Sequence, residues 1–278
     1  MDNINSTKTS TPNISSSNIS LPNILAIGGS DSSGGAGIQA DIIAITENQS
    51  RAATAITAIT SQNNDSVSDI FKLPSNVVQK QIETIINKVD IKIIKTGMLT
   101  DSNIVRTIAS TIPTDIPIII DPVIKSSSGV ELIDENGVEE MKKLLFPRSL
   151  LVTPNIDELK ELLNIEKSKE ILENTDIDNL PLESDGYLIE LGKEFIRKFG
   201  CDNILIKGGH SNDKNVVDIL ITRNGEIFKF SNPRVTGNFR GTGCRLASAI
   251  SVFIAKGYSI DEAVKRANKY IQQYILNY

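Results

Sequence analysis

Residues 91–122 read IKIIKTGMLTDSNIVRTIASTIPTDIPIIIDP, in which two apolar runs flank a helical pattern. The runs at 91–94 and 116–120 are rich in isoleucine, and 103–110 carries its apolar residues at helical spacing. Strands that are buried on both faces read as continuous apolar runs, and strands joined by a helix lie parallel in one sheet. This segment therefore predicts two parallel strands with a helix between them.

The same alternation extends in both directions along the chain. Further strands are expected at 24–27, 52–60, 150–153 and 204–206, and further helices at 38–48, 77–89, 137–145, 157–163 and 191–199. A hairpin at the sheet edge is predicted from 216–221 and 226–230, and a capping box at 259–262 opens a final helix. The predicted fold is α/β: a three-layer sandwich with a mostly parallel central sheet, helices on both faces and a small edge hairpin.

Length and composition limit the classes of protein to consider. The chain has 278 residues, 40% of them hydrophobic, and residues 22–278 are expected to form one domain. Residues 1–21 are rich in Ser, Thr and Asn, resemble neither a secretory signal nor a transit peptide, and are expected to be a disordered extension. A net charge of −5 argues against nucleic acid as a partner, and no apolar run approaches the roughly 20 residues of a membrane span.

Cysteine and histidine usage indicates the compartment. Cys201 and Cys244 are the two cysteines and His210 is the one histidine, which supports neither a disulfide framework nor a zinc site. A reducing cytoplasm fits this composition best.

Residues 239–250, FRGTGCRLASAI, combine two glycines with the start of an apolar helix. A glycine turn that leads into a helix N-terminus is an anion site, because unpaired amides and the positive end of the helix dipole face the ligand. Cys244 is the residue there that can exchange a proton, and a helix N-terminus is expected to lower its pKa. The pattern suggests phosphoryl or acyl transfer, whereas a small buried hydrophobe is the alternative role of Cys244.

The segment 28–37 follows the first predicted strand and is expected to be a loop. Within it, residues 35–40 fit G-x-G-x-x-A, a pattern of dinucleotide-binding proteins. We reject that interpretation because the first glycine stands about seven residues from the strand and no acid for a ribose ends the next strand. A loop that closes over a small substrate and a purely structural loop both remain open.

Two acids could hold a magnesium ion. Asn155 and Glu158 fit a helix capping box, whereas the functional alternative places Glu158 on a magnesium-bound water beside phosphate. Asp121, at the end of a predicted strand, is the second candidate acid. Lys207 could meet a phosphate, and Arg240 and Arg245 either serve the anion turn or are solvated at the surface.

Polar and glycine residues gather after the predicted strands, at 28–29, 62–63, 96–97, 121, 155 and 207–209. The carboxyl ends of parallel strands share one edge of a sheet, where ligands bind. These loops and the 241–244 turn are therefore expected to form one crevice.

Seven motifs in this order resemble one branch of the ribokinase-type small-molecule kinases. They are GGSDSSGGAGIQAD (28–41), AITSQN (58–63), KTGML (95–99), DPV (121–123), TPNIDE (153–158), KGGH (207–210) and GTGC (241–244). The branch is the hydroxymethylpyrimidine kinase/phosphomethylpyrimidine kinase family of thiamine synthesis, and the resemblance runs from about residue 24 to the C-terminus. It implies two ATP-dependent steps, from 4-amino-5-hydroxymethyl-2-methylpyrimidine to its monophosphate and then to the diphosphate.

The resemblance also implies roles for individual residues. Cys244 would be the base, and the amides of Gly241, Thr242, Gly243 and Cys244 the anion hole. Pyrimidine would be bound by Gln62, Gly29, Ala36, Asp41, Met98 and Val123. ATP is expected to be bound by Lys207, Gly209, Thr153 and Asn155, and magnesium by Glu158 and Asp121. A homodimer is expected too, and a monovalent cation is a further expectation.

Three positions depart from the pattern of that family. Arg240 replaces the usual histidine before the turn, and Arg245 replaces the usual threonine after it. Ser127 stands where a lysine is usual, with Lys125 two residues earlier. Our hypothesis is that Arg240 contacts the ATP phosphates. A pyridoxal or pyridoxine kinase, an inactive pyrimidine-binding homologue and a dinucleotide-dependent oxidoreductase are the alternative functions.

Overall fold

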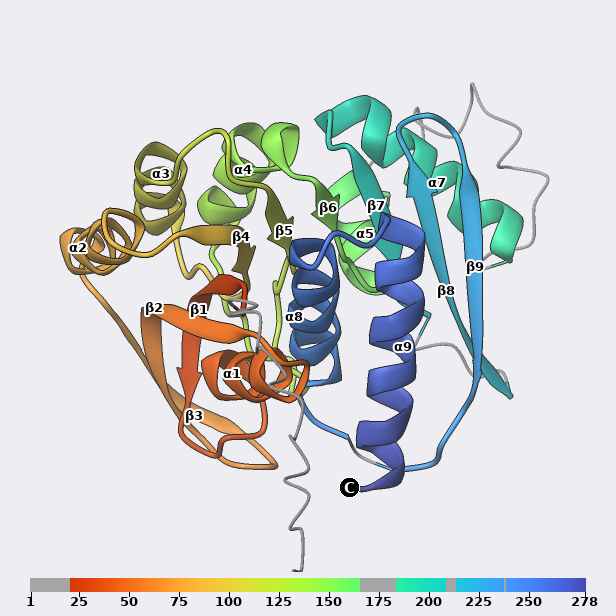
Figure 1. Ribbon diagram of the computed structural model, residues 1–278, viewed down its shortest axis with the longest axis horizontal. Coiled ribbons are helices and arrows are strands. Elements are labelled where there is room, and N and C mark those ends of the chain that lie inside the picture. Colours follow the sequence, from red (N-terminus) through yellow and green to blue (C-terminus); the bar gives the residue numbers. More distant parts are fainter. Residues whose placement is uncertain (1–20, 166–183, 209–213, 238) are drawn as a thin grey trace, which may run out of the picture.

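The computed structural model describes residues 21–165, 184–208, 214–237 and 239–278 (Figure 1). Its centre is a nine-stranded sheet in the order β3-β2-β1-β4-β5-β6-β7-β8-β9. The strands are β1 (Asn23–Asp31), β2 (Arg51–Gln62), β3 (Val67–Lys72), β4 (Ile91–Thr96), β5 (Ile118–Ile120), β6 (Leu151–Val152), β7 (Asn203–Ile206), β8 (Asn215–Thr222) and β9 (Ile227–Pro233). The six central strands, from β2 to β7 in this order, pair parallel with one another. The edge strand β3 pairs antiparallel with β2, and at the other edge β8 pairs antiparallel with both β7 and β9.

Helices cover both faces of this sheet (Figure 1). They are α1 (Gly37–Glu47), α2 (Ser75–Ile86), α3 (Ser102–Thr111), α4 (Glu135–Leu144), α5 (Ile156–Leu163), α7 (Asp185–Phe199), α8 (Thr242–Ala255) and α9 (Ile260–Leu276), with a short 3-10 helix at Phe146–Arg148. One apolar core lies between the sheet and α2, α3, α4, α5 and α7, and the other lies between the sheet and α1, α8 and α9.

Alternation along the central strands explains the two cores. In β4, Ile94 packs into the α2–α7 core and Ile93 into the α1–α8–α9 core, because successive side chains point to opposite faces. Neither side chain is exposed. The prediction from 91–122 is confirmed, since β4, α3 and β5 follow one another and β4 pairs parallel with β5.

The structure corrects the sequence prediction at two places in the sheet. Strand β1 runs on through Asp31, which pairs with Thr60, so the expected loop after residue 27 begins later. Strand β3 was not predicted, because it is an exposed antiparallel edge strand with no apolar run, and Phe71 in it is 63% exposed.

Two helix starts also differ from expectation. The capping box at 259–262 is not formed, because the Ser259 side chain makes no cap hydrogen bond and instead bonds to the Asp261 carboxylate. The helix expected at 191–199 begins at Asp185, where the Ser184 side chain accepts from the Tyr187 amide.

Parts of the earlier predictions lie outside the described residues. These are residues 1–20 of the expected extension, together with Gly209 and His210. Within the described ranges, no helix is long and apolar enough to cross a membrane.

Candidate active site

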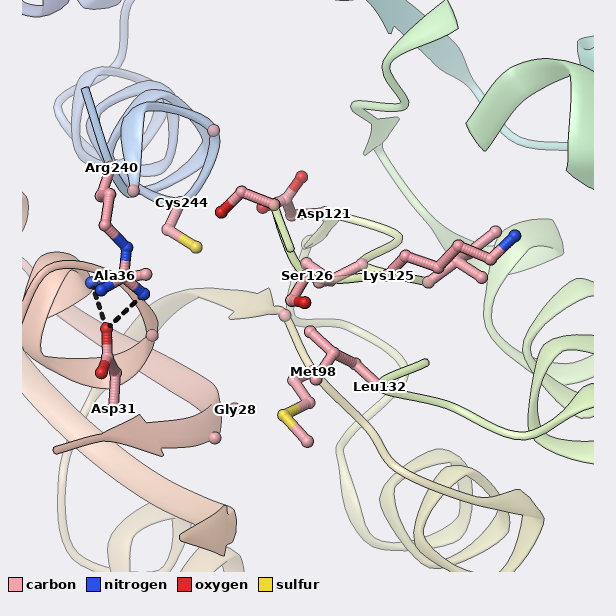
Figure 2. Close-up of a pocket in the computed structure, with 18 of the residues that line it drawn as sticks. Gly28, Asp31, Ala36, Met98, Asp121, Lys125, Ser126, Leu132, Arg240 and Cys244 are labelled. Atoms are coloured by element: carbon pink, nitrogen blue, oxygen red, sulfur yellow. Dashed lines mark hydrogen bonds and ion pairs between the residues drawn. The ribbon is translucent and has the colours of Figure 1, made fainter. Parts of the chain in front are cut away.

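A cavity of about 720 Å³ opens at the carboxyl ends of the parallel strands (Figure 2). The loops after β1, β4, β5 and β6, the end of β2 and the N-terminus of α8 all line it. This is the edge at which open α/β sheets bind ligands. The expected single crevice is therefore present.

The turn at 241–243 brings α8 against residues 32–36, the glycine loop between β1 and α1. Gly241 has a φ of +67°, and a Cβ atom there would lie 2.2 Å from the Gly35 carbonyl oxygen. Only glycine combines this left-handed conformation with such a close backbone approach. The first turn of α8, which begins at Thr242, faces the cavity, so its amide groups are placed to bind an anion.

Cys244 lies in this first turn, and its sulfur points into the cavity (Figure 2). Burial raises the pKa of the thiol to about 11, although the charge of Lys95 opposes the shift. The expectation that the helix N-terminus lowers this pKa is wrong for the ligand-free protein, because the loss of solvation outweighs it. Without ligand, Cys244 is a neutral thiol at pH 7.

A buried ion pair lies behind Cys244. Lys95 Nζ is 2.8 Å from Asp41 Oδ1, and both side chains are 1% exposed. Ser248 Oγ on α8 donates to the same carboxylate oxygen at 2.8 Å. Burial raises the pKa of Asp41, whereas the Asp41 charge raises the pKa of Lys95 against the effect of burial. Lys95 had no predicted role, although a lysine at the end of an apolar strand is a signal.

Lys207 joins the two candidate acids next to the turn. Its Nζ lies 2.7 Å from Asp121 Oδ1 and 3.9 Å from Glu158 Oε2, and a Cβ atom at Gly243 would be 3.2 Å from it. Burial would raise the pKa of Asp121, but the charges of Lys207 and Lys95 hold it below its usual value. Burial, assisted by Asp121, raises the pKa of Glu158 to about 7.

The capping box of α5 is formed. Asn155 Oδ1 accepts from the Glu158 amide at 2.7 Å, and Glu158 Oε2 accepts from the Asn155 amide at 2.8 Å. Both residues also line the cavity, so the capping role and a role at the site do not exclude each other.

The residues expected to bind pyrimidine are brought together, because all of them line the cavity: Gln62, Gly29, Ala36, Asp41, Met98 and Val123. Neighbouring residues hold Gln62 in place. Thr60 Oγ1 donates to the side-chain Oε1 of Gln62 at 3.1 Å, and the backbone N–H of Gln62 donates to Ser32 Oγ at 2.8 Å. A Cβ atom at Gly29 would lie 2.7 Å from the Met98 sulfur, so this wall is closely packed.

The residues expected to bind ATP divide into three groups. Lys207, Asn155 and Arg240 line the cavity. Thr153 is fully buried, does not line it, and donates to Asp121 Oδ1 at 3.3 Å. Gly209 lies outside the described residues.

Neither arginine beside the turn is solvated at the surface. Arg240 is 6% exposed, and its Nη2 lies 3.3 Å from Asp31 Oδ2 (Figure 2). Arg245 is 4% exposed and stacks on Tyr274, with 4.2 Å between its Cζ and the ring centroid. The surface alternative is therefore wrong for both.

Comparisons with known proteins identify the relatives of this chain. The family model described as phosphomethylpyrimidine kinase matches residues 31–278. The chain is 36% identical over 253 residues to the thiamine biosynthesis bifunctional protein ThiED of Geobacter sulfurreducens, covering 89% of this chain but only 48% of that protein. It is 33% identical over 256 residues to the hydroxymethylpyrimidine/phosphomethylpyrimidine kinase of Mycobacterium bovis, covering 91% of this chain and 87% of that one.

Solved structures share the fold. The phosphomethylpyrimidine kinase (thiD) of Clostridium difficile 630 is 31% identical with a TM-score of 0.73, over 91% of this chain and 99% of that one. The pyridoxal kinase of Staphylococcus aureus in complex with pyridoxal is 28% identical with a TM-score of 0.77, over 92% and 88% of the two chains. The fold is therefore that of the ribokinase-like kinases.

Proposed function

The chain belongs to the phosphomethylpyrimidine kinase family, and we propose that it phosphorylates a hydroxymethylpyrimidine in two ATP-dependent steps of thiamine biosynthesis. The first step converts 4-amino-5-hydroxymethyl-2-methylpyrimidine to its monophosphate, and the second converts the monophosphate to the diphosphate. One observation carries the proposal: Cys244 and the amides of the 241–244 turn share a cavity with Gln62 and the glycine loop.

Phosphoryl transfer depends mainly on position and on neutralised charge. In the first step the substrate hydroxyl oxygen attacks the γ-phosphorus of ATP, the bond to the β–γ bridging oxygen breaks, and ADP leaves. The Sγ of Cys244 accepts the hydroxyl proton after the thiol has released its own proton to solvent in the complex with the ligands, because its raised pKa keeps it neutral before they bind. Lys95 and the α8 N-terminus favour that thiolate, and the amides of 241–244 and Lys207 stabilise the transferred phosphoryl group.

On the other side of the cavity, the substrate ring would lie between the glycine loop and the 97–98 segment. The Gln62 amide can both donate and accept, which suits an amino group next to a ring nitrogen. Gly29, Ala36, Met98 and Val123 supply small or apolar surface, and Asp41 lines the cavity beside Lys95.

Asp121 and Glu158 are proposed to hold magnesium. Among the described residues there is no cluster of three or more potential metal ligands. Two carboxylates nevertheless fit Mg²⁺, which is usually held by one or two acids together with waters and substrate phosphates. When bound, the ion would neutralise charge on the phosphates, and Lys207 holds both carboxylates at the cavity before it binds.

On the ATP side, the proposed contacts are Lys207 and Asn155, which line the cavity, and Gly209. Thr153 supports Asp121. We also propose one catalytic domain at 22–278 with an N-terminal extension, a homodimer, a cytoplasmic location and use of a monovalent cation. These follow from the composition and from the family resemblance.

A coupled assay of ADP release tests the function. Purified protein is given ATP, Mg²⁺ and either hydroxymethylpyrimidine, its monophosphate or pyridoxal. We expect turnover with both pyrimidines at a higher kcat/KM than with pyridoxal. The structural similarity to a pyridoxal kinase makes pyridoxal the informative competitor. A higher kcat/KM with pyridoxal would show that the protein is a pyridoxal kinase. Binding of pyrimidine without turnover would show that it is an inactive homologue.

A further inference from the structure

The Arg240 guanidinium contacts two segments that lie far from it in the sequence. Its Nη1 donates to Ser33 Oγ at 2.8 Å and to the Asn63 carbonyl oxygen at 2.7 Å, with Asn64 Oδ1 at 3.3 Å. Its Nη2 donates to Asp31 Oδ2 at 3.3 Å (Figure 2). Both terminal nitrogens of the guanidinium group, Nη1 and Nη2, therefore donate to oxygen atoms of the protein itself.

Asp31 in turn organises the glycine loop. Its Oδ1 accepts from the Ser33 amide at 2.9 Å and from the Ser33 hydroxyl at 2.8 Å. Its Oδ2 accepts from the Ala36 amide at 2.8 Å, and the side chain is 4% exposed. Arg240 compensates the charge of a carboxylate that shapes residues 31–36.

The second segment carries Gln62. Ser32 Oγ donates to the Gln62 carbonyl oxygen at 2.8 Å, so the end of β2 is tied to the glycine loop. Asn63, the next residue, accepts from Arg240. Ala36 and Gln62, from two segments of the pyrimidine side, are thus both connected to the residue that precedes Gly241.

We propose that Arg240 is a positioning residue that sets the pyrimidine-binding loops against the catalytic turn. Through Asp31, Ser33 and Asn63 it fixes the distance between the glycine loop, the end of β2 and Cys244. The ligand named here rests on the proposed function, whereas the positioning itself is a property of the fold. Arg240 then acts through other residues and does not contact the ATP phosphates, which replaces our hypothesis from the sequence.

Kinetics of four variants test the proposal: Arg240→Ala, Arg240→Lys, Asp31→Asn and the double variant Arg240→Ala/Asp31→Asn. A misplacement of about 1 Å can cost about 100-fold in rate, so we expect kcat/KM for hydroxymethylpyrimidine to fall about 10- to 100-fold in Arg240→Ala. KM for ATP should stay within about twofold. Arg240→Lys should recover part of the loss, because lysine keeps the charge but not the planar fork of donors.

Asp31→Asn separates positioning from direct phosphate binding. If Arg240 acts through Asp31, the effects of the two single variants are coupled, and the double variant is no worse than Arg240→Ala. Additive losses, or a raised KM for ATP with an unchanged KM for pyrimidine, would overturn the proposal. Arg106→Ala is the matched control, since Arg106 is an exposed arginine whose Nη2 lies 3.2 Å from Glu140, and it should leave the kinetics unchanged.

A second variant and a second measurement cover the case in which Arg240→Ala does not fold. Ser33→Ala removes a hydroxyl that links Arg240 to Asp31, and it should raise KM for pyrimidine but not for ATP. Hydrogen exchange at the amides of 33–36 and 63–66 should be faster than in the parent protein, with no change in β4. Unchanged exchange and kinetics in Ser33→Ala would refute the positioning role. Because exchange needs no substrate, it tests the positioning even if the parent protein does not phosphorylate pyrimidine.

Discussion

The ammonium group of Lys95 lies 2.8 Å from Asp41 Oδ1 in a place where neither side chain is more than 1% exposed. A charge in such surroundings is stable only when it is paired, because burial removes its hydration. The pair is part of the cavity wall, since both residues line it. Its contribution to the free energy of unfolding can nevertheless be measured without an activity assay.

Lys95→Met is expected to destabilise the protein by about 3–5 kcal/mol, because it leaves the Asp41 carboxylate buried with Ser248 as its remaining partner. Adding Asp41→Asn should restore part of this loss. Urea unfolding measures both. Lys92→Met is the matched control on the same strand, since Lys92 is half exposed and its pair with Asp90 contributes about 0–1 kcal/mol. Equal losses in the two lysine variants would contradict a buried charge pair.

Cys244→Ala is expected to lower kcat about 10²- to 10⁴-fold, the usual contribution of a positioned acid or base. The Kd for hydroxymethylpyrimidine should change little, because Gln62 and the glycine loop are untouched. Steady-state kinetics and calorimetry give the two quantities. Cys201→Ala, which removes the other cysteine, should keep its activity; an equally active Cys244→Ala would remove the thiol from the mechanism.

The raised pKa of Cys244, about 11, predicts slow alkylation of the ligand-free protein at neutral pH. A thiol with a raised pKa stays protonated up to a higher pH. Alkylation is therefore slow at neutral pH, because only the thiolate reacts. The rate with iodoacetamide, followed by mass spectrometry, should rise about tenfold per pH unit from pH 7 to pH 10. The side chain of Cys201 is fully buried, and burial raises its pKa to about 12. Cys201 should therefore stay unmodified in the folded protein. A rate that begins to level off at about pH 9 would show an unshifted thiol, whose usual pKa is about 8.5.

Gln62→Ala should raise KM for hydroxymethylpyrimidine about 5- to 100-fold, because an unpaired polar group in a closed site costs about 1–3 kcal/mol. KM for ATP should change far less, since Gln62 lies on the glycine-loop side of the cavity. Gln79→Ala on the exposed face of α2, where Gln79 donates to Glu83, is the control. Equal changes in both KM values would assign Gln62 to the structure rather than to substrate binding.

Chelation of Mg²⁺ should abolish turnover, and Glu158→Gln should raise the Mg²⁺ concentration needed for half-maximal rate. Glutamine can keep the capping box, because its amide oxygen still accepts from the Asn155 amide, so stability should change little. Glu140→Gln on α4 controls for the loss of a surface charge. If Glu158→Gln altered stability but not the Mg²⁺ requirement, its role would be that of a cap alone.

The sequence predicted most of the fold because the central strands are buried on both faces. Continuous apolar runs separated by helical patterns have few other solutions than a parallel sheet between helix layers. Strand β3 was not predicted, because an exposed edge strand buries few side chains and its residues therefore form no continuous apolar run. The end of β1 was not predicted either, because Ser30 and Asp31 are polar residues that nevertheless pair with β2.

Local chemistry was enough to nominate Cys244, Glu158 and Lys207, since strand ends and helix starts are visible in a sequence, whereas the role of Gln62 came from the family resemblance. What the tertiary structure alone decided is which charges face each other. Lys95 meets Asp41, and Arg240 meets Asp31, across 54 and 209 residues of chain. Such pairings, and the burial that raises the pKa of Cys244, arise only when distant segments exclude water together, and no local pattern encodes them.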